Sequence, residues 1–110
     1  MITLNGLKTC DTCRRAMKAL TAAGKTVELR DLRASPPSVD EITAWRAVFG
    51  ESLMNTRSTT WRGLSDDDRA GDPVAVMMAH PALIKRPVIT RAGETPLLGW
   101  TPATKAELGV

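Results

Sequence analysis

Within the first thirty residues, the spacing of apolar residues changes from that of a strand to that of a helix and back. This change constrains the fold more than any other feature. Residues 2–6 (ITLNG) favour a short strand ending at a glycine, and residues 27–30 (VELR) alternate like a strand with one buried face. Between them, apolar residues recur with the spacing of one helix face, at Cys13, Ala16, Met17, Leu20 and Ala23. This order predicts a βαβ unit with parallel strands and a right-handed crossover.

The middle of the chain favours helices. Ser38–Glu41 has the pattern of a capping box, which begins a helix. Asp72 followed by Pro73 favours a second helix start, because proline fits the first helical position. On that helix we expect the apolar side chains to point inward, namely Val74, Met77 and Met78.

The last part of the chain predicts a β-hairpin and a final helix. Residues 87–90 and 96–98 are strand-like and flank a turn at residues 92–94. Residues 101–108 begin with Thr-Pro and predict a short helix. The expected order is therefore β-α-β, a helical stretch, then β-β-α. A length of 110 residues indicates one domain, residues 1–110.

Composition narrows the class of protein. The apolar fraction is 43% and the charged fraction 25%, as in an ordinary folded globule, and no run approaches the ~20 apolar residues of a membrane span. The first residues lack the pattern of a signal peptide, so we expect a cytoplasmic protein that does not enter a membrane. The net charge is only +3, the basic residues are scattered and aromatic residues are few, so direct nucleic-acid binding is not expected.

The two cysteines form a C-x-x-C motif. A disulfide between Cys10 and Cys13 would close a tiny loop and constrain the unfolded chain little, so redox chemistry or metal binding explains the pair better than a structural staple. A structural zinc ion needs four ligands, and adding His80 supplies only three, so we expect no metal. Inert buried thiols are the other alternative, which suits Cys13 on the apolar stripe better than Cys10.

Cys10 lies where the first predicted strand gives way to the helix. The first amides of a helix lack partners within it and favour a negative charge, so a thiolate at this point is stabilised. Lys8 and Arg14 could add positive charge. Cys13 follows three residues later, roughly one turn along, and could attack a disulfide formed at Cys10. We therefore expect Cys10 to be the nucleophile and Cys13 the resolving thiol.

Three further features admit two interpretations each. Pro87 could face the thiol from a neighbouring strand, with Arg86 and Lys85 adding positive charge, or it could be an ordinary proline at a strand start. The acidic run Asp66–Asp68 is either a cation site or, more simply, a solvated helix start. His80 precedes a proline at a helix end, where a favourable interaction with the helix dipole is more plausible than catalysis as a base.

Three blocks of the sequence carry a family resemblance. They are T-C-D-T-C-R-R-A at residues 9–16, L-M-N-T-R-S-T-T-W-R-G-L at residues 53–64 and H-P-A-L-I-K-R-P-V-I at residues 80–89. Together they resemble the ArsC family of arsenate reductases. The family includes the Spx-type regulators and a branch of small reductase-like proteins, which this chain resembles most. The resemblance implies an α/β, thioredoxin-like fold with a mixed four-stranded sheet and a helical insertion, at about residues 36–80, between the second and third strands.

The same resemblance implies a set of site residues. Cys10 matches the cysteine that attacks arsenate in the glutaredoxin-linked reductases, where glutathione and glutaredoxin complete the cycle. Of the three arginines that hold the oxyanion there, Arg86 matches one, and the second falls at Asn55, with Arg57 two residues away. The third falls around residues 98–100, where this sequence has no arginine. A lost charge-assisted contact costs about 1.5–3 kcal/mol.

Two functions follow from the resemblance. The first is a thiol-dependent reductase without a tightly bound cofactor, which uses glutathione or glutaredoxin to reduce arsenate or another small substrate. The alternative is a redox-sensing regulator like Spx, in which the C-x-x-C senses oxidation and a surface binds RNA polymerase.

Overall fold

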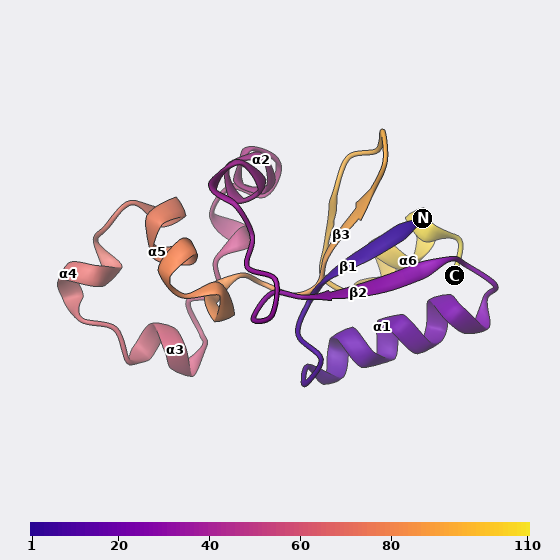
Figure 1. The fold of residues 1–110 in the computed structure, drawn as a ribbon, viewed down its shortest axis with the longest axis horizontal. Helices are drawn as coiled ribbons and strands as arrows, with labels where there is room; N and C mark the ends of the chain where they lie inside the picture. The colour runs from indigo at the N-terminus through magenta and orange to yellow at the C-terminus, as the bar shows by residue number, and fades with distance from the viewer. The chain divides into compact units, whose positions relative to one another are not determined.

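A mixed four-stranded sheet positions the two cysteines. In the computed structural model, which describes all 110 residues, the strand order is β2-β1-β3-β4. Strand β1 (Ile2–Gly6) pairs in parallel with β2 (Val27–Asp31) and antiparallel with β3 (Val88–Arg91), which pairs antiparallel with β4 (Leu97–Leu98). The βαβ unit and the mixed sheet predicted from the sequence are confirmed (Figure 1).

Two helices complete the part of the chain that carries the sheet. Helix α1 (Asp11–Ala22) connects β1 to β2, and α6 (Pro102–Leu108) follows β4. One hydrophobic core joins these helices to the central strands; its buried members are Ile2, Leu4, Ala16, Leu20, Ile89 and Leu108. We call this part, Met1–Leu32 together with Arg86–Val110, the sheet unit.

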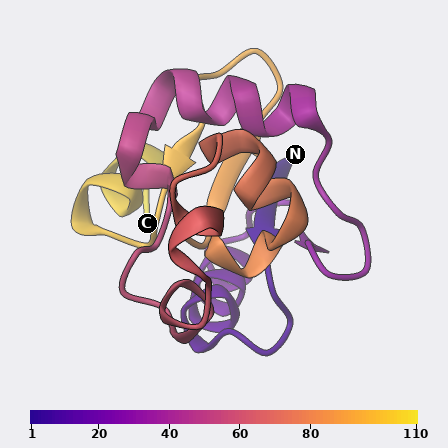
Figure 2. The same ribbon diagram turned by 90° about the vertical axis from the view of Figure 1, so that its left-hand side faces the viewer.

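The segment Arg33–Lys85 forms a second unit, which we call the helical unit. It contains α2 (Val39–Phe49), the 3₁₀ turn η1 (Gly50–Leu53), α3 (Thr59–Arg62), α4 (Asp66–Arg69), α5 (Pro73–Ala79) and the 3₁₀ turn η2 (Pro81–Leu83) (Figure 2). A serine or aspartate side chain caps each α-helix by accepting a hydrogen bond from a backbone amide; the caps are Ser38, Ser58, Ser65 and Asp72. Such caps let short helices begin at defined residues.

The inward face predicted for α5 is only partly correct. Met77 is buried and Val74 is half-buried, but Met78 is 36% exposed. The helix has only seven residues, and its buried side chains are the neighbours Val76 and Met77. Met78 lies one residue further round the helix and therefore leaves the packed face.

No helix in the chain is both long enough and apolar enough to cross a membrane. The division into one domain with an insertion at residues 36–80 stays a prediction.

Candidate active site

Cys10 occupies the residue that begins α1. It is the N-cap of that helix, with extended backbone angles, and its carbonyl accepts the first helical hydrogen bond, from the Arg14 amide at 3.0 Å. Its own amide donates to the Leu7 carbonyl at 3.1 Å, which closes the turn between β1 and α1. The residue is half-buried, in contrast to the fully buried Cys13.

The surroundings of Cys10 favour its thiolate. Burial raises the pKa of the Cys10 thiol, but hydrogen bonds from the Cys13 amide and the Cys13 thiol, the charge of Arg86 and the Thr12 amide outweigh it, so the pKa lies below its ordinary value. In its neutral form, the Cys10 side chain accepts no capping hydrogen bond from the first amides of α1. The amides act on the charged form, to which they donate at the positive end of the helix.

Cys13 has the opposite character. Its side chain is 0% exposed and lies on the buried face of α1 with Ala16 and Leu20. Burial raises the pKa of the Cys13 thiol to about 11, and although a Leu7 backbone hydrogen bond opposes the rise, the hydrogen bond to Cys10 and the charge of Cys10 add to it. At neutral pH Cys13 is therefore a protonated thiol, and of the two thiols in the motif Cys10 is the more acidic.

Arg86 and Pro87 lie at the start of β3 in the same unit. The Arg86–Pro87 peptide bond is cis, Pro87 is buried, and the Pro87 carbonyl accepts a hydrogen bond from the Gly99 amide at 2.8 Å. The positive charge of Arg86 favours the thiolate form of both cysteines. It contributes to the lowered pKa of Cys10 and partly opposes the rise in the pKa of Cys13. The bond to Gly99 brings the segment that lacks the third expected arginine next to Pro87.

Lys8 and Arg14 belong to the loop and the first turn that surround Cys10. Both residues are exposed. The Arg14 Nε donates to the Lys8 carbonyl at 2.8 Å, and the Lys8 amide donates to Asp31 Oδ2 at 3.2 Å, which ties the loop to the end of β2. Arg14 thus has a contact within the loop, whereas the cation that lowers the Cys10 pKa is Arg86.

Asn55 and Arg57 belong to the helical unit. The Asn55 amide donates to the Leu83 carbonyl at 2.7 Å, and the Asn55 side-chain oxygen accepts from the Arg57 amide at 3.1 Å. Together with Lys85 they line an open polar pocket of about 470 Å³, to which Ser52, Met54 and Thr56 also contribute. Two cations and no acidic side chain line this pocket, so it suits an anion.

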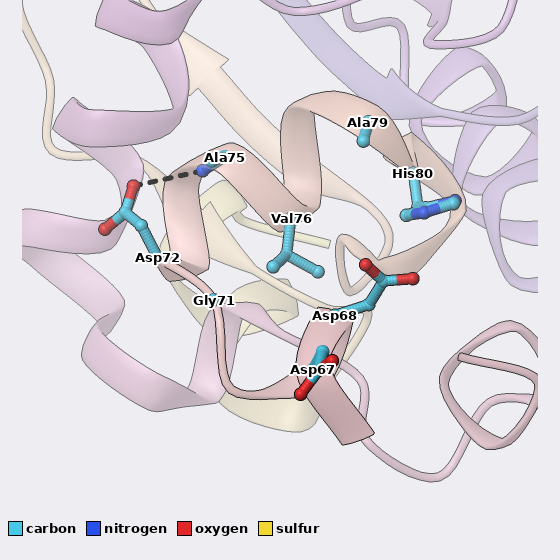
Figure 3. A pocket seen from close by; sticks show the side chains of 8 residues that line it. All are labelled: Asp67, Asp68, Gly71, Asp72, Ala75, Val76, Ala79 and His80. Atoms are coloured by element: carbon cyan, nitrogen blue, oxygen red, sulfur yellow. Dashed lines mark hydrogen bonds between the residues drawn. The ribbon is translucent and has the colours of Figure 1, made fainter. Parts of the chain in front are cut away.

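His80 and the acidic run occupy a different pocket of the helical unit. Figure 3 shows Asp67, Asp68 and His80 around it, with Asp72 accepting from the Ala75 amide as a helix cap. The three aspartates form the exposed first turn of α4, as a solvated helix start does. No group of three or more His, Cys, Asp or Glu side chains in the chain has an arrangement that could hold a metal ion.

Two residues near the cysteines were missed by the sequence analysis. Asn5 on β1 is 2% exposed, and its side-chain amide donates to the Val88 carbonyl at 2.9 Å and to Thr90 at 3.2 Å. Gly6 ends β1 directly beside Cys13. A polar residue followed by a glycine within an otherwise apolar strand was the only signal, because buried polar groups and strand glycines both need a specific reason.

Comparison with known proteins identifies the family. A model of the ArsC family matches residues 6–107. The chain belongs to the ArsC family. It is 35% identical over 105 residues to an uncharacterized protein of Haemophilus influenzae, covering 91% of each chain. The solved structure of the YffB protein has a TM-score of 0.83 at 28% identity, covering 98% of each chain.

A second solved structure is similar over almost the full length. An arsenate reductase (ArsC) related protein from Brucella melitensis has a TM-score of 0.73 at 29% identity, covering 99% of this chain and 95% of that one. The resemblance inferred from the three sequence blocks is therefore confirmed, and so is the thioredoxin-like fold. Membership places the chain among thiol-dependent reductases and related proteins.

Proposed function

We propose that this ArsC-family chain is a thiol-dependent oxidoreductase in which the Cys10 thiolate attacks the substrate and Cys13 resolves the product. The observation that carries the proposal is the difference between the two sulfurs. Cys10 is accessible and its pKa is lowered, whereas Cys13 is buried and its pKa is raised to about 11. An accessible, electropositive surrounding is typical of reactive cysteines.

In the proposed cycle, the two electrons that reduce the substrate come from the Cys10 and Cys13 thiols, which become a disulfide. The Cys10 thiolate displaces an oxygen ligand of an oxyanion such as arsenate, which takes up protons and leaves as water, and a sulfur–arsenic bond forms. Cys13 loses its proton and attacks the Cys10 sulfur. The sulfur–arsenic bond breaks with its electron pair on arsenic, so arsenic is reduced to arsenite and the Cys10–Cys13 disulfide forms. Two glutathione thiols, with glutaredoxin as the catalyst, return the disulfide to two thiols and become glutathione disulfide.

A glutathione mixed disulfide fits the same pair of sulfurs. In a first exchange, the Cys10 thiolate attacks the glutathionyl sulfur of a small disulfide, the sulfur–sulfur bond of that disulfide breaks, and its other half leaves as a thiolate. Cys13 then loses its proton and attacks the Cys10 sulfur, which releases glutathione thiolate and leaves the same Cys10–Cys13 disulfide. We therefore propose that the substrate is arsenate or another small molecule reduced by thiol chemistry, and that glutathione is a co-substrate rather than a bound cofactor.

The anionic part of the substrate is proposed to contact Arg86 beside Cys10. Within the sheet unit, Lys8 and Arg14 are proposed as further anion contacts and Pro87 is proposed to face the substrate. Asn55 and Arg57 are proposed to bind an anion in the polar pocket of the helical unit. The segment at Leu98–Trp100, next to Pro87 through the Gly99 hydrogen bond, offers no arginine. A missing forked contact weakens oxyanion binding, which favours a substrate held by one or two cations over one held by three.

The test combines a titration with a turnover assay. Alkylation of Cys10 followed against pH should give a midpoint below that of free cysteine, and reduction of arsenate or of a glutathione mixed disulfide should be measurable with glutathione, glutaredoxin and glutathione reductase. Cys10→Ser should abolish turnover, and Cys13→Ser should stop the cycle after the first covalent step. A Cys10 midpoint equal to that of free cysteine contradicts the proposal, as does full turnover by Cys10→Ser.

A further inference from the structure

Gly6 lies where β1 meets the buried sulfur of the motif. A Cβ atom placed on Gly6 would overlap the Cys13 Sγ, whereas it would lie 3.6 Å from the Cys13 Cβ and 3.9 Å from the Arg86 Cβ, both ordinary contacts. The conflict therefore concerns one atom, the sulfur. Gly6 itself is buried and hydrogen-bonded in the sheet, where its carbonyl accepts from the Leu32 amide at 2.8 Å.

The backbone of Gly6 does not require a glycine. The glycines with positive φ in this chain are Gly24, Gly50, Gly93, Gly99 and Gly109, and Gly6 is not among them. A glycine within a strand weakens the strand, because it costs conformational entropy and leaves no side chain to pack. Where neither backbone nor packing calls for glycine, the close approach of another group is the remaining physical reason.

The Cys13 sulfur has little freedom to move away from Gly6. Its Cα is fixed by α1, which packs into the core through Ala16 and Leu20, both 0% exposed. The side chain has a single torsion, so a sulfur displaced by a new methyl group must rotate about χ1 or push α1 from the sheet. Either movement changes the distance between the Cys13 and Cys10 sulfurs.

We infer that Gly6 is a positioning residue of the C-x-x-C site, because the side chain it lacks leaves the room in which the Cys13 sulfur lies against β1 and next to Cys10. This inference rests on the proposed function in so far as Cys13 is the resolving thiol. Gly6 also neighbours Arg86, so one small residue lies beside two of the residues that act on the Cys10 thiolate.

A double-mutant cycle tests the inference. The variants are Gly6→Ala, Cys13→Ala and the combination, each studied as the full chain. The readouts are the pH profile of Cys10 alkylation, the rate at which the Cys10–Cys13 disulfide forms in variants that keep both thiols, and the melting temperature. Gly63→Ala is the matched control, because Gly63 also has ordinary φ and its added Cβ would lie 3.5 Å from the nearest atom.

Gly6→Ala should move the Cys10 alkylation midpoint upward, slow alkylation at pH 7 several-fold, slow disulfide formation and lower the melting temperature. In the Cys13→Ala background the added methyl group makes only ordinary contacts, with the Cβ atoms of residue 13 and Arg86, so Gly6→Ala should leave the midpoint unchanged and should not lower the melting temperature. If the effect of Gly6→Ala disappears in this background, the effect depends on the Cys13 sulfur and not on a general role of Gly6 in the strand.

Two results would overturn the inference. One is a Gly6→Ala variant with the wild-type profile and disulfide rate; the other is an equal effect of Gly6→Ala with and without the Cys13 sulfur. If Gly6→Ala does not fold, folding of the double variant supports the inference and its failure to fold contradicts it. Absence of reductase turnover in the wild type would contradict the proposed function while leaving this coupling measurable.

Discussion

Alkylation at neutral pH should modify Cys10 and leave Cys13 unmodified. The thiolate is the reacting form, and burial raises the pKa of the Cys13 thiol to about 11. At pH 7 such a thiol is ionised in roughly one molecule in 10⁴, against about 3% for a free cysteine with a pKa of ~8.5, a difference of roughly 300-fold. The side chain is also 0% exposed, so restricted access slows the reaction further.

The assay is a time course with iodoacetamide in excess, followed by mass spectrometry of the peptides that contain each cysteine. We expect Cys10 to react faster than a free cysteine at pH 7, because the pKa of its thiol is lowered by the neighbouring donors and Arg86 despite burial. In molecules whose Cys10 is still unmodified, Cys13 should react at least about 300-fold more slowly than a free cysteine. In denaturant the two residues should react alike, which is the internal control.

The result that would refute this reasoning is modification of Cys13 in the folded protein at a rate near that of free cysteine. It would mean that the sulfur is neither buried nor held against β1, and the division of roles between the two cysteines would lose its physical basis. Equal rates for both cysteines under native conditions would contradict it in the same way.

Three further expectations concern charge, pH and the buried polar residue. Arg86→Met should raise the Cys10 alkylation midpoint because it removes a charge that favours the thiolate, whereas Lys85→Met, which removes the same charge one residue away, should change it less. Folding raises the pKa of the Cys13 thiol to about 11, so the contribution of this thiol to the free energy of unfolding should be complete below about pH 9 and should be lost as the pH rises to about 11. In this pH range, the free energy of unfolding measured in urea should depend less on pH for Cys13→Ala than for the wild type. Asn5→Ala should cost about 1–3 kcal/mol in urea unfolding, because it removes a buried side chain with two donor hydrogen bonds, and a smaller loss would contradict the role given to that network.

Prediction from the sequence was most accurate where it relied on the spacing of residues within one helix or at one helix start. Of the five residues in the predicted helical stripe, Cys13, Ala16 and Leu20 are 0% exposed and Met17 is partly buried, whereas Ala23 follows the end of α1 and is exposed. The capping pattern at Ser38 likewise appears as a complete capping box with Glu41. These features depend on residues close together in the chain, so local spacing contains the information that determines them.

The parts that sequence reasoning missed depend on contacts between distant segments. Gly6 meets Cys13 only because β1 and α1 pack together, and Asn5 is satisfied by β3, more than eighty residues away. The sequence indicated four cations near the thiol, namely Lys8, Arg14, Lys85 and Arg86. Of these, Arg86, which follows seventy-six residues after Cys10, is the one whose charge lowers the Cys10 pKa. No local pattern distinguishes among these cations, because the distance to the sulfur is set by the pairing of β1 with β3.

The coupling between the two sulfurs also predicts the order of the chemical steps. Two of the causes that raise the Cys13 pKa come from Cys10 itself, namely the hydrogen bond to its sulfur and its negative charge. Once the Cys10 sulfur is bonded to a substrate, both causes are lost, so Cys13 should ionise more readily only after the first step. Ultraviolet absorbance of the thiolate, titrated in protein already alkylated at Cys10 and in Cys10→Ser, should therefore place the Cys13 midpoint below its value in the reduced wild type. An unchanged or higher midpoint in both samples would contradict this reasoning. It would show that burial, the largest cause, raises the pKa of the Cys13 thiol without a contribution from the charge on Cys10.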